Sequence, residues 1–157
     1  MSVLKSLKDY LDDNGIKYKV ISHSPAYTAQ EIAALVHVPG KELAKTVIVK
    51  ADEGYAMAVL PASRKINLEA LKDVMSAKHV ELAKEEEFGK MFPDCEVGAM
   101  PPFGNLYDLP IYVAKALSED EEIVFNAGTH TDAIKMSYQD LERLVKPVIA
   151  DFSEQMN

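Results

Sequence analysis

The sequence predicts a single α+β domain, residues 1–157, built on a mixed or partly closed β-sheet flanked by helices. Short apolar runs typical of strands, each bounded by Gly, Pro, Asn or Asp, are intermixed with helical patterns along the chain. A doubly wound fold would need a longer alternation of strands and helices. The length of 157 residues is the usual size of one domain.

Five helices are expected from apolar spacing and capping residues. In the first, Leu4, Leu7 and Leu11 recur at three- and four-residue steps, and Asn14-Gly15 ends the pattern. In the second, Thr28 and Glu31 form a capping box before an apolar run through Val36. The five helices are predicted to begin near Val3, Thr28, Asn67, Glu85 and Ser137, the fourth running to Met91 and the last closing at Pro147.

A β-hairpin is expected at the centre of the sheet. The β-favouring runs 46–50 and 55–60 are separated by Ala51-Asp-Glu-Gly54, which predicts a four-residue turn. Further short strands are predicted at 79–82, 95–97, 111–113, 123–125 and 133–136.

Composition limits the compartment and the partners. The net charge of −8 argues against broad, sequence-independent binding of nucleic acid such as DNA, because that mode depends on Lys and Arg neutralising phosphates. An enzyme that grips only terminal nucleotides needs no more than a local basic pocket. No apolar run is long enough for a membrane span, and the single cysteine, Cys95, suits a reducing compartment. We therefore expect a cytoplasmic protein without a membrane partner.

Three segments are candidates for chemistry. The stretch Gly98-Ala-Met-Pro-Pro-Phe-Gly104 can present backbone amides to a ligand, although alone it more often marks a tight connection between strands. Lys45 begins a strongly apolar strand, where its ammonium either snorkels to water, the commoner case, or faces a pocket. Asn126-Ala-Gly-Thr-His130 ends a strand, and its imidazole either contacts a ligand or bonds locally.

Other chemistries find no support in the sequence. The four histidines and Cys95 have no metal-ligand spacing, so no metal is expected. There is no phosphate loop, dinucleotide fingerprint or Gly-x-Ser-x-Gly elbow, and no cofactor is expected. Cys95 lies in an apolar run, which predicts a buried, inert thiol.

Several segments, taken in order, resemble the YbaK/prolyl-tRNA synthetase-associated editing domain family, over about residues 4–148. They are His23-Ser-Pro-Ala-Tyr-Thr28, Leu43-Ala-Lys-Thr46, Leu60-Pro-Ala62, Phe92-Pro-Asp94, Gly98-Ala-Met-Pro-Pro-Phe-Gly104 and Phe125-Asn-Ala-Gly-Thr-His130. The resemblance implies a partly open, barrel-like sheet flanked by helices. It also implies hydrolysis of the ester between a wrong amino acid and the 3′ acceptor end of a mischarged tRNA, in some members by a free-standing protein.

Residue by residue, the resemblance implies that Lys45 is the functional lysine and that Gly98 and Pro102 belong to the catalytic loop. Lys45 would orient the ester or nearby ribose and phosphate oxygens, and loop amides would stabilise the developing oxyanion, an effect of about 3 kcal/mol per donor. A small amino acid, alanine, cysteine or serine, is expected. The substrate-binding residues implied are Ile32, Thr46, Met100, Gly128, Thr129 and His130.

Two other functions remain open at this level. The chain could be a non-catalytic module that binds tRNA or an aminoacyl-tRNA synthetase, although Lys45 together with the intact loop favours catalysis. It could also be a small-molecule esterase, which would hydrolyse simple aminoacyl esters without tRNA. The sequence specifies neither the amino acid, the tRNA, a partner synthetase nor the oligomeric state.

Overall fold

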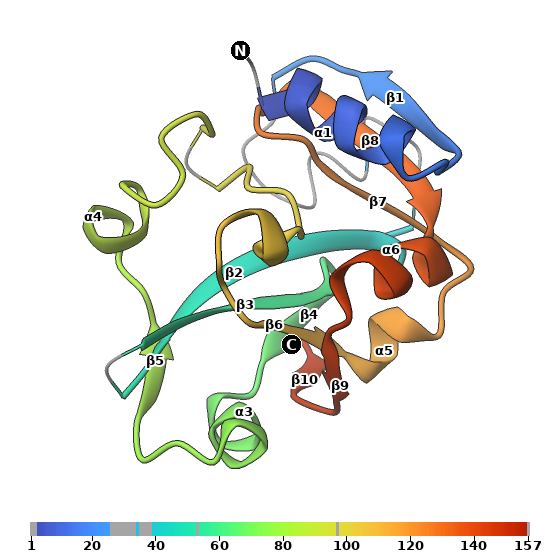
Figure 1. Cartoon of the computed structure of the whole chain (residues 1–157). Helices are drawn as coiled ribbons and strands as arrows, with labels where there is room; N and C mark the ends of the chain where they lie inside the picture. Colours follow the sequence, from blue (N-terminus) through green and yellow to red (C-terminus); the bar gives the residue numbers. More distant parts are fainter. Residues whose placement is uncertain (1–2, 26–33, 35–38, 53, 97, 157) are drawn as a thin grey trace.

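The computed structural model describes residues 3–25, 34, 39–52, 54–96 and 98–156, which form a large mixed sheet flanked by helices (Figure 1). Its strands run in the order β1-β8-β7-β2-β3-β6-β9, and β5 also pairs with β2. Strands β4 and β10 make a second, small sheet. The strands are β1 Tyr18–Ser22, β2 Leu43–Ala51, β3 Gly54–Pro61, β4 Arg64–Ile66, β5 Val80–Leu82, β6 Ile111–Ala114, β7 Glu122–Asn126, β8 Asp132–Ser137, β9 Val148–Ala150 and β10 Ser153–Gln155.

The predicted central hairpin is confirmed, but its turn is shorter than expected. Strands β2 and β3 pair from Ala44 with Pro61 to Ala51 with Gly54, so pairing extends to both ends of the predicted four-residue turn. Asp52 takes a positive φ of 54° there, which a non-glycine residue rarely adopts. Its carboxylate accepts hydrogen bonds from the amides of Lys78 and His79, at 3.1 and 3.0 Å, which hold the turn against the chain before β5.

The sheet is mixed, as predicted, and it is open rather than closed. Strands β1, β8 and β7 pair antiparallel, whereas β7 with β2, β3 with β6, and β6 with β9 pair parallel. Strands β1 and β9 form opposite edges, so the sheet does not close into a barrel.

Helices pack on both faces of the sheet. Leu7 and Leu11 of α1, with Leu141 and Val145 of α6, join one buried cluster with Phe103. Leu71 of α3 packs on the other face with Phe152. Figure 1 shows this separation, with α1 at the top, α6 at the right and α3 at the bottom. The helices are α1 Val3–Asp13, α3 Leu68–Met75, α4 Glu85–Phe88, α5 Lys115–Ser118 and α6 Tyr138–Val145, with a 3-10 turn η1 at Gly104–Leu106.

Four sequence-based expectations differ from the structure or lie outside the described residues. The helix predicted at 28–36 lies outside the described residues except for Ala34, which is helical. The helix α4 ends at Phe88 rather than Met91. The strand predicted at 95–97 is wrong for Cys95 and Glu96, because the Cys95 amide turns back to the carbonyl of Phe92 at 3.0 Å. Cys95 is half-buried rather than buried, and desolvation raises the pKa of its thiol.

Strand β2 changes its neighbour along its length, and this positions the candidate site. It pairs with β7 only through Leu43 and Ala44, and it pairs with β5 only from Val49 onward. Between these points, one edge of β2 has no strand partner in the described part of the chain. No helix in that part is long and apolar enough to cross a membrane.

Candidate active site

The glycine- and proline-rich loop 98–104 and the turn 126–132 meet at the end of β7. A backbone hydrogen bond joins them, because the Gly128 amide donates to the carbonyl of Ala99 at 2.9 Å, and the Gly128 carbonyl also accepts from the amide of Glu96, two residues before the loop, at 2.8 Å. Gly98 has a φ of +85°, and a Cβ built there would lie 3.7 Å from His130 Cε1. Two of the three predicted segments therefore form one site.

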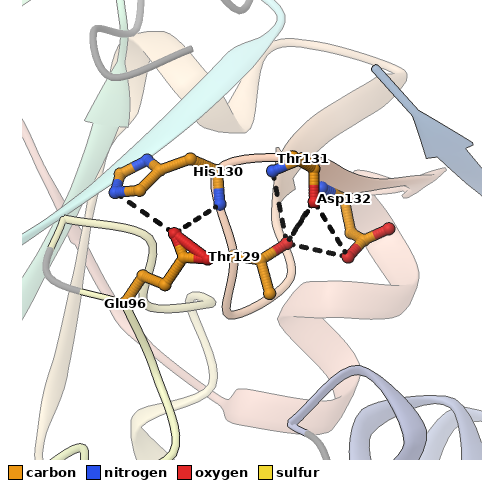
Figure 2. Close-up of polar contacts among 5 residues, drawn as sticks. All are labelled: Glu96, Thr129, His130, Thr131 and Asp132. Carbon is orange, nitrogen blue, oxygen red and sulfur yellow. Dashed lines mark hydrogen bonds and ion pairs between the residues drawn. The ribbon is translucent and has the colours of Figure 1, made fainter. Parts of the chain in front are cut away.

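The turn is held by the side chain of Thr129. Its Oγ1 donates to Asp132 Oδ2 at 2.8 Å and accepts from the amides of Asp132 and Thr131 at 3.0 and 3.3 Å (Figure 2). These bonds use the hydroxyl inside the turn. Thr129, predicted to contact substrate, thus has a structural role here that its position in the sequence did not indicate.

His130 is 7% exposed and lies against Glu96. Its Nε2 is 3.9 Å from Glu96 Oε2, and its backbone amide donates to the same oxygen at 3.2 Å (Figure 2). Glu96 was not predicted, because a glutamate inside an apolar run has no recognisable spacing to a histidine 34 positions later. Glu96 therefore holds the backbone of His130 by a hydrogen bond and places its carboxylate next to the imidazole.

Lys45 lies where β2 and β7 separate. Ala44 pairs with Phe125 in the parallel ladder, so Lys45 and Asn126 are the next residues along the two strands when pairing ends. The lysine is partly buried, and desolvation lowers the pKa of its ammonium group. Among the described residues, Lys45 makes no ion pair. A cation without a carboxylate partner can interact with an anionic or carbonyl oxygen of a ligand.

Two buried polar atoms belong to residues where β2 and β7 separate. Thr46 Oγ1 and Asn126 Oδ1 have no hydrogen-bond partner among the described residues. The carbonyls of Glu42 and Ile48 bond to Val124 and Ala83 on the β7 and β5 edge of β2. Because backbone direction alternates along a strand, Thr46 turns its own N–H and C=O to that edge. Asn126 was not predicted as a site residue, although it is the last residue of β7.

The loop offers fewer amides than its length suggests. Pro101 and Pro102 have no N–H, and the Ala99 amide already donates to the carbonyl of Glu96 at 3.0 Å. Gly98 and Met100 are the remaining loop amides before Phe103 and have no backbone acceptor in the described part of the chain. The Met100 side chain is 4% exposed within the core, and Pro102 is also buried. Ile32, predicted to contact substrate, lies outside the described residues.

The chain is similar in sequence to proteins of one known family. Residues 23–144 match the model of the aminoacyl-tRNA editing domain. The prolyl-tRNA editing protein ProX of Acetoanaerobium sticklandii is 26% identical over 142 residues, which cover 87% of this chain and 86% of that protein. The proline–tRNA ligase of Fervidobacterium nodosum is 34% identical over 77 residues, 49% of this chain but only 13% of the ligase.

Solved structures share the fold. A candidate trans-editing enzyme for prolyl-tRNA synthetase superposes with a TM-score of 0.86 at 20% identity, covering 98% of both chains. A hypothetical protein gives a TM-score of 0.86 at 24% identity, covering 94% of this chain and 99% of the other. The family model covers well over half of the chain, and the chain therefore belongs to the aminoacyl-tRNA editing domain family, as a hydrolase of the aminoacyl-tRNA deacylase class.

Proposed function

We propose that this protein acts in trans, removing a small amino acid, alanine, cysteine or serine, from the 3′ end of a mischarged tRNA. The observation that carries the proposal is the joining of the 98–104 loop to the His130 turn through Gly128, at the end of the strand beside Lys45. The likeness to a prolyl-tRNA editing protein and to segments of proline–tRNA ligases supports tRNA as the substrate and a synthetase as a possible partner.

In the proposed reaction, water attacks the ester carbonyl carbon, and the bond to the ribose oxygen breaks. The amino acid leaves with a free carboxylate, and the ribose recovers its hydroxyl. The Lys45 ammonium orients the ester or a neighbouring phosphate oxygen, and the amides of Gly98 and Met100 donate to the developing oxyanion. His130 contacts the terminal adenosine, and Thr46 Oγ1 donates to or accepts from the substrate, since it has no partner in the described part of the chain.

Activation of the water is assigned to the substrate. Glu96 is the carboxylate that contacts His130, and its Oε2 already accepts a hydrogen bond from the His130 amide and lies 3.9 Å from the imidazole Nε2. A ribose hydroxyl next to the ester is positioned to take this role. Substrate ending in a deoxyadenosine that lacks this hydroxyl should then be hydrolysed at least a hundredfold more slowly. Hydrolysis at the full rate would rule out substrate-assisted activation while leaving the roles of Lys45 and the loop in place.

Single-turnover deacylation of tRNA(Pro) carrying alanine or cysteine, and of tRNA carrying serine, tests the proposal. We expect selective release of one amino acid, a loss of at least a hundredfold in Lys45→Ala, and little change in Lys19→Ala, whose lysine is exposed on β1. Since one methylene discriminates by only about 1–3 kcal/mol, a second small amino acid should be released more slowly. If wild-type protein binds these tRNAs but accelerates none of the esters, the chain is a binding module instead.

A further inference from the structure

A cavity lies between α1 and the part of the chain around Asp94 and from Pro101 to Tyr107. It encloses about 240 Å³ and is lined by Leu7, Tyr10, Asp94, Pro101, Leu106 and Tyr107 among others. We call it the Tyr10–Tyr107 pocket. Its lining includes Asp94 of the Phe92-Pro-Asp94 segment, to which the proposed reaction gives no role.

Each of the two tyrosine rings of the pocket packs against a phenylalanine ring. Tyr107 packs on Phe92 with ring centroids 4.5 Å apart, and Tyr10 packs edge-on against Phe103 at 6.0 Å. The Tyr10 hydroxyl accepts a hydrogen bond from Asn105 Nδ2 at 3.0 Å and keeps its own proton for another acceptor. Rigid aromatic walls lose little conformational entropy when a flat ring binds between them.

The charge and size of the pocket indicate the kind of ligand. Asp94 is the charged residue of the lining, and it is exposed. A carboxylate at the rim repels phosphate but accepts a hydrogen bond from an exocyclic amine such as N4 of cytosine. A volume of about 240 Å³ is below that of drug-sized sites and fits one planar base. Aromatic side chains that stack bases are the usual means of binding single-stranded nucleic acid.

The pocket also lies within one nucleotide of the catalytic loop. Pro101 of its wall is three residues after Gly98, so their Cα atoms are at most about 11 Å apart. A terminal adenosine at His130 would therefore place the preceding nucleotide close to this pocket.

We propose that the Tyr10–Tyr107 pocket binds the base of the penultimate nucleotide of the tRNA, a cytosine, by stacking and by a hydrogen bond to Asp94. This inference rests on the proposed function for its substrate. It assigns recognition of the acceptor end to a second site, which explains how an acidic protein holds a tRNA through bases rather than through phosphates.

The test uses mischarged minihelices with either cytosine or an abasic residue at the penultimate position. Leu106→Glu places a charge in the pocket, and Asp94→Ala removes the acceptor. Leu82→Glu and Asp151→Ala are matched controls, because Leu82 on β5 is an exposed leucine like Leu106, and Asp151 before β10 is an exposed aspartate like Asp94. Single-turnover rates over a range of protein concentrations separate the half-saturating concentration from the maximal rate, and melting temperatures check folding.

We expect Leu106→Glu to raise the half-saturating concentration about tenfold on the cytosine substrate, at the lower end of what base stacking contributes, with an unchanged maximal rate. Asp94→Ala should raise it several-fold. On the abasic substrate both variants should behave like wild type, and the controls should match wild type on both substrates. Equal effects of Leu106→Glu on the two substrates, or no effect on either, would overturn the inference even if deacylation proceeds.

Binding of the uncharged trinucleotide cytidylyl-cytidylyl-adenosine separates this inference from the proposed function. Binding that Leu106→Glu and Asp94→Ala weaken supports the pocket even if no ester is hydrolysed, in which case the deacylase proposal alone fails. Binding of the trinucleotide with equal affinity to wild type and both variants would count against the pocket, whatever the result with esters.

Discussion

The Lys45 ammonium, which the proposed reaction requires, destabilises the fold. Desolvation lowers the pKa of its ammonium group, which means that folding disfavours the charged form. The destabilisation is fully present below the folded-state pKa and fades as the pH rises through the interval between the folded and the unfolded pKa values. The site thus retains a charge that the core would exclude.

Replacing Lys45 by Met should therefore abolish deacylation and raise the melting temperature at pH 7. The methionine keeps the length of the side chain without the charge. The gain in melting temperature should shrink once the pH exceeds the lowered pKa of Lys45, because wild type is then uncharged there as well. Thermal denaturation at pH 7 and at high pH measures this, with Lys19→Met as the exposed control. A lower melting temperature in Lys45→Met would mean that the ammonium stabilises the fold.

Gly98 and Gly15 allow backbone strain to be separated from catalysis. Both have positive φ, 85° and 68°, and both have room for a Cβ, with the closest contact 3.7 Å at Gly98 and nothing within 4 Å at Gly15. Alanine should cost each about 1–2 kcal/mol of the free energy of unfolding. Only Gly98→Ala should also lower the maximal rate, by at least tenfold, because it reorients the loop amides. Chemical denaturation and single-turnover assays on both variants measure the two effects, and equal activities would exclude the loop from catalysis.

The turn 126–132 depends on one hydroxyl for its shape. Thr129→Val should cost about 1–3 kcal/mol, since the amides of Thr131 and Asp132 lose their acceptor and Asp132 its donor. Activity should fall with it, because His130 lies in the same turn. Thr129→Ser keeps the hydroxyl and should remain close to wild type in both urea denaturation and deacylation. If Thr129→Val and Thr129→Ser are equally stable in urea denaturation, the turn is held by its backbone alone.

Elements with strong local signals were predictable from the sequence, whereas short paired elements were not. Asn67 begins α3 as predicted, and its side chain accepts the Ala70 amide at 3.0 Å. Strands β4 and β10 have three residues each and form through pairing with each other, with Arg64 donating to Ser153. Their partners are too far apart in sequence for any local pattern to reveal them. The strand expected at 95–97 failed because a short apolar run is equally compatible with a buried loop.

At the site, sequence alone indicated the segments but not the supporting contacts. Lys45, Gly98 and His130 were predicted from position and resemblance. Glu96, Asn126 and the rigid pocket walls depend on which segments the sheet brings together, and a single sequence does not contain that information. The side chain of Met100 shows the reverse case, because a residue that resemblance assigned to the substrate is packed in the core.

Asp120 should contribute more stability to the molecule at mildly acidic pH than at neutral pH. Burial raises the pKa of this carboxyl from 3.8 to about 6, with Lys41 opposing and Glu42 and Glu119 adding to the effect. Its Oδ2 is buried without a partner among the described residues. Because the folded-state pKa is the higher, the contribution of the protonated form is complete below pH 3.8 and is lost as the pH rises through about 6.

Asp120→Asn should accordingly melt at a higher temperature than wild type at pH 7.5, and the difference should narrow by pH 5. Asp151→Asn, at an exposed position, serves as the control and should follow wild type at both pH values. Thermal melts in buffers of equal ionic strength measure this. A constant difference between Asp120→Asn and wild type across the range would show that the carboxyl does not titrate differently in the folded and unfolded chains.

The order of strands determines when during synthesis the sheet can form. Tyr18 pairs with Met136, and Arg64 pairs with Gln155, so both sheets join early and late parts of the chain. Closing such long loops is slow, and strands β1 and β4 must wait for partners that leave the ribosome late. During that interval their edges are unpaired and able to pair with other chains. Translation that stops before β8 should therefore yield an aggregating product rather than a partly active one.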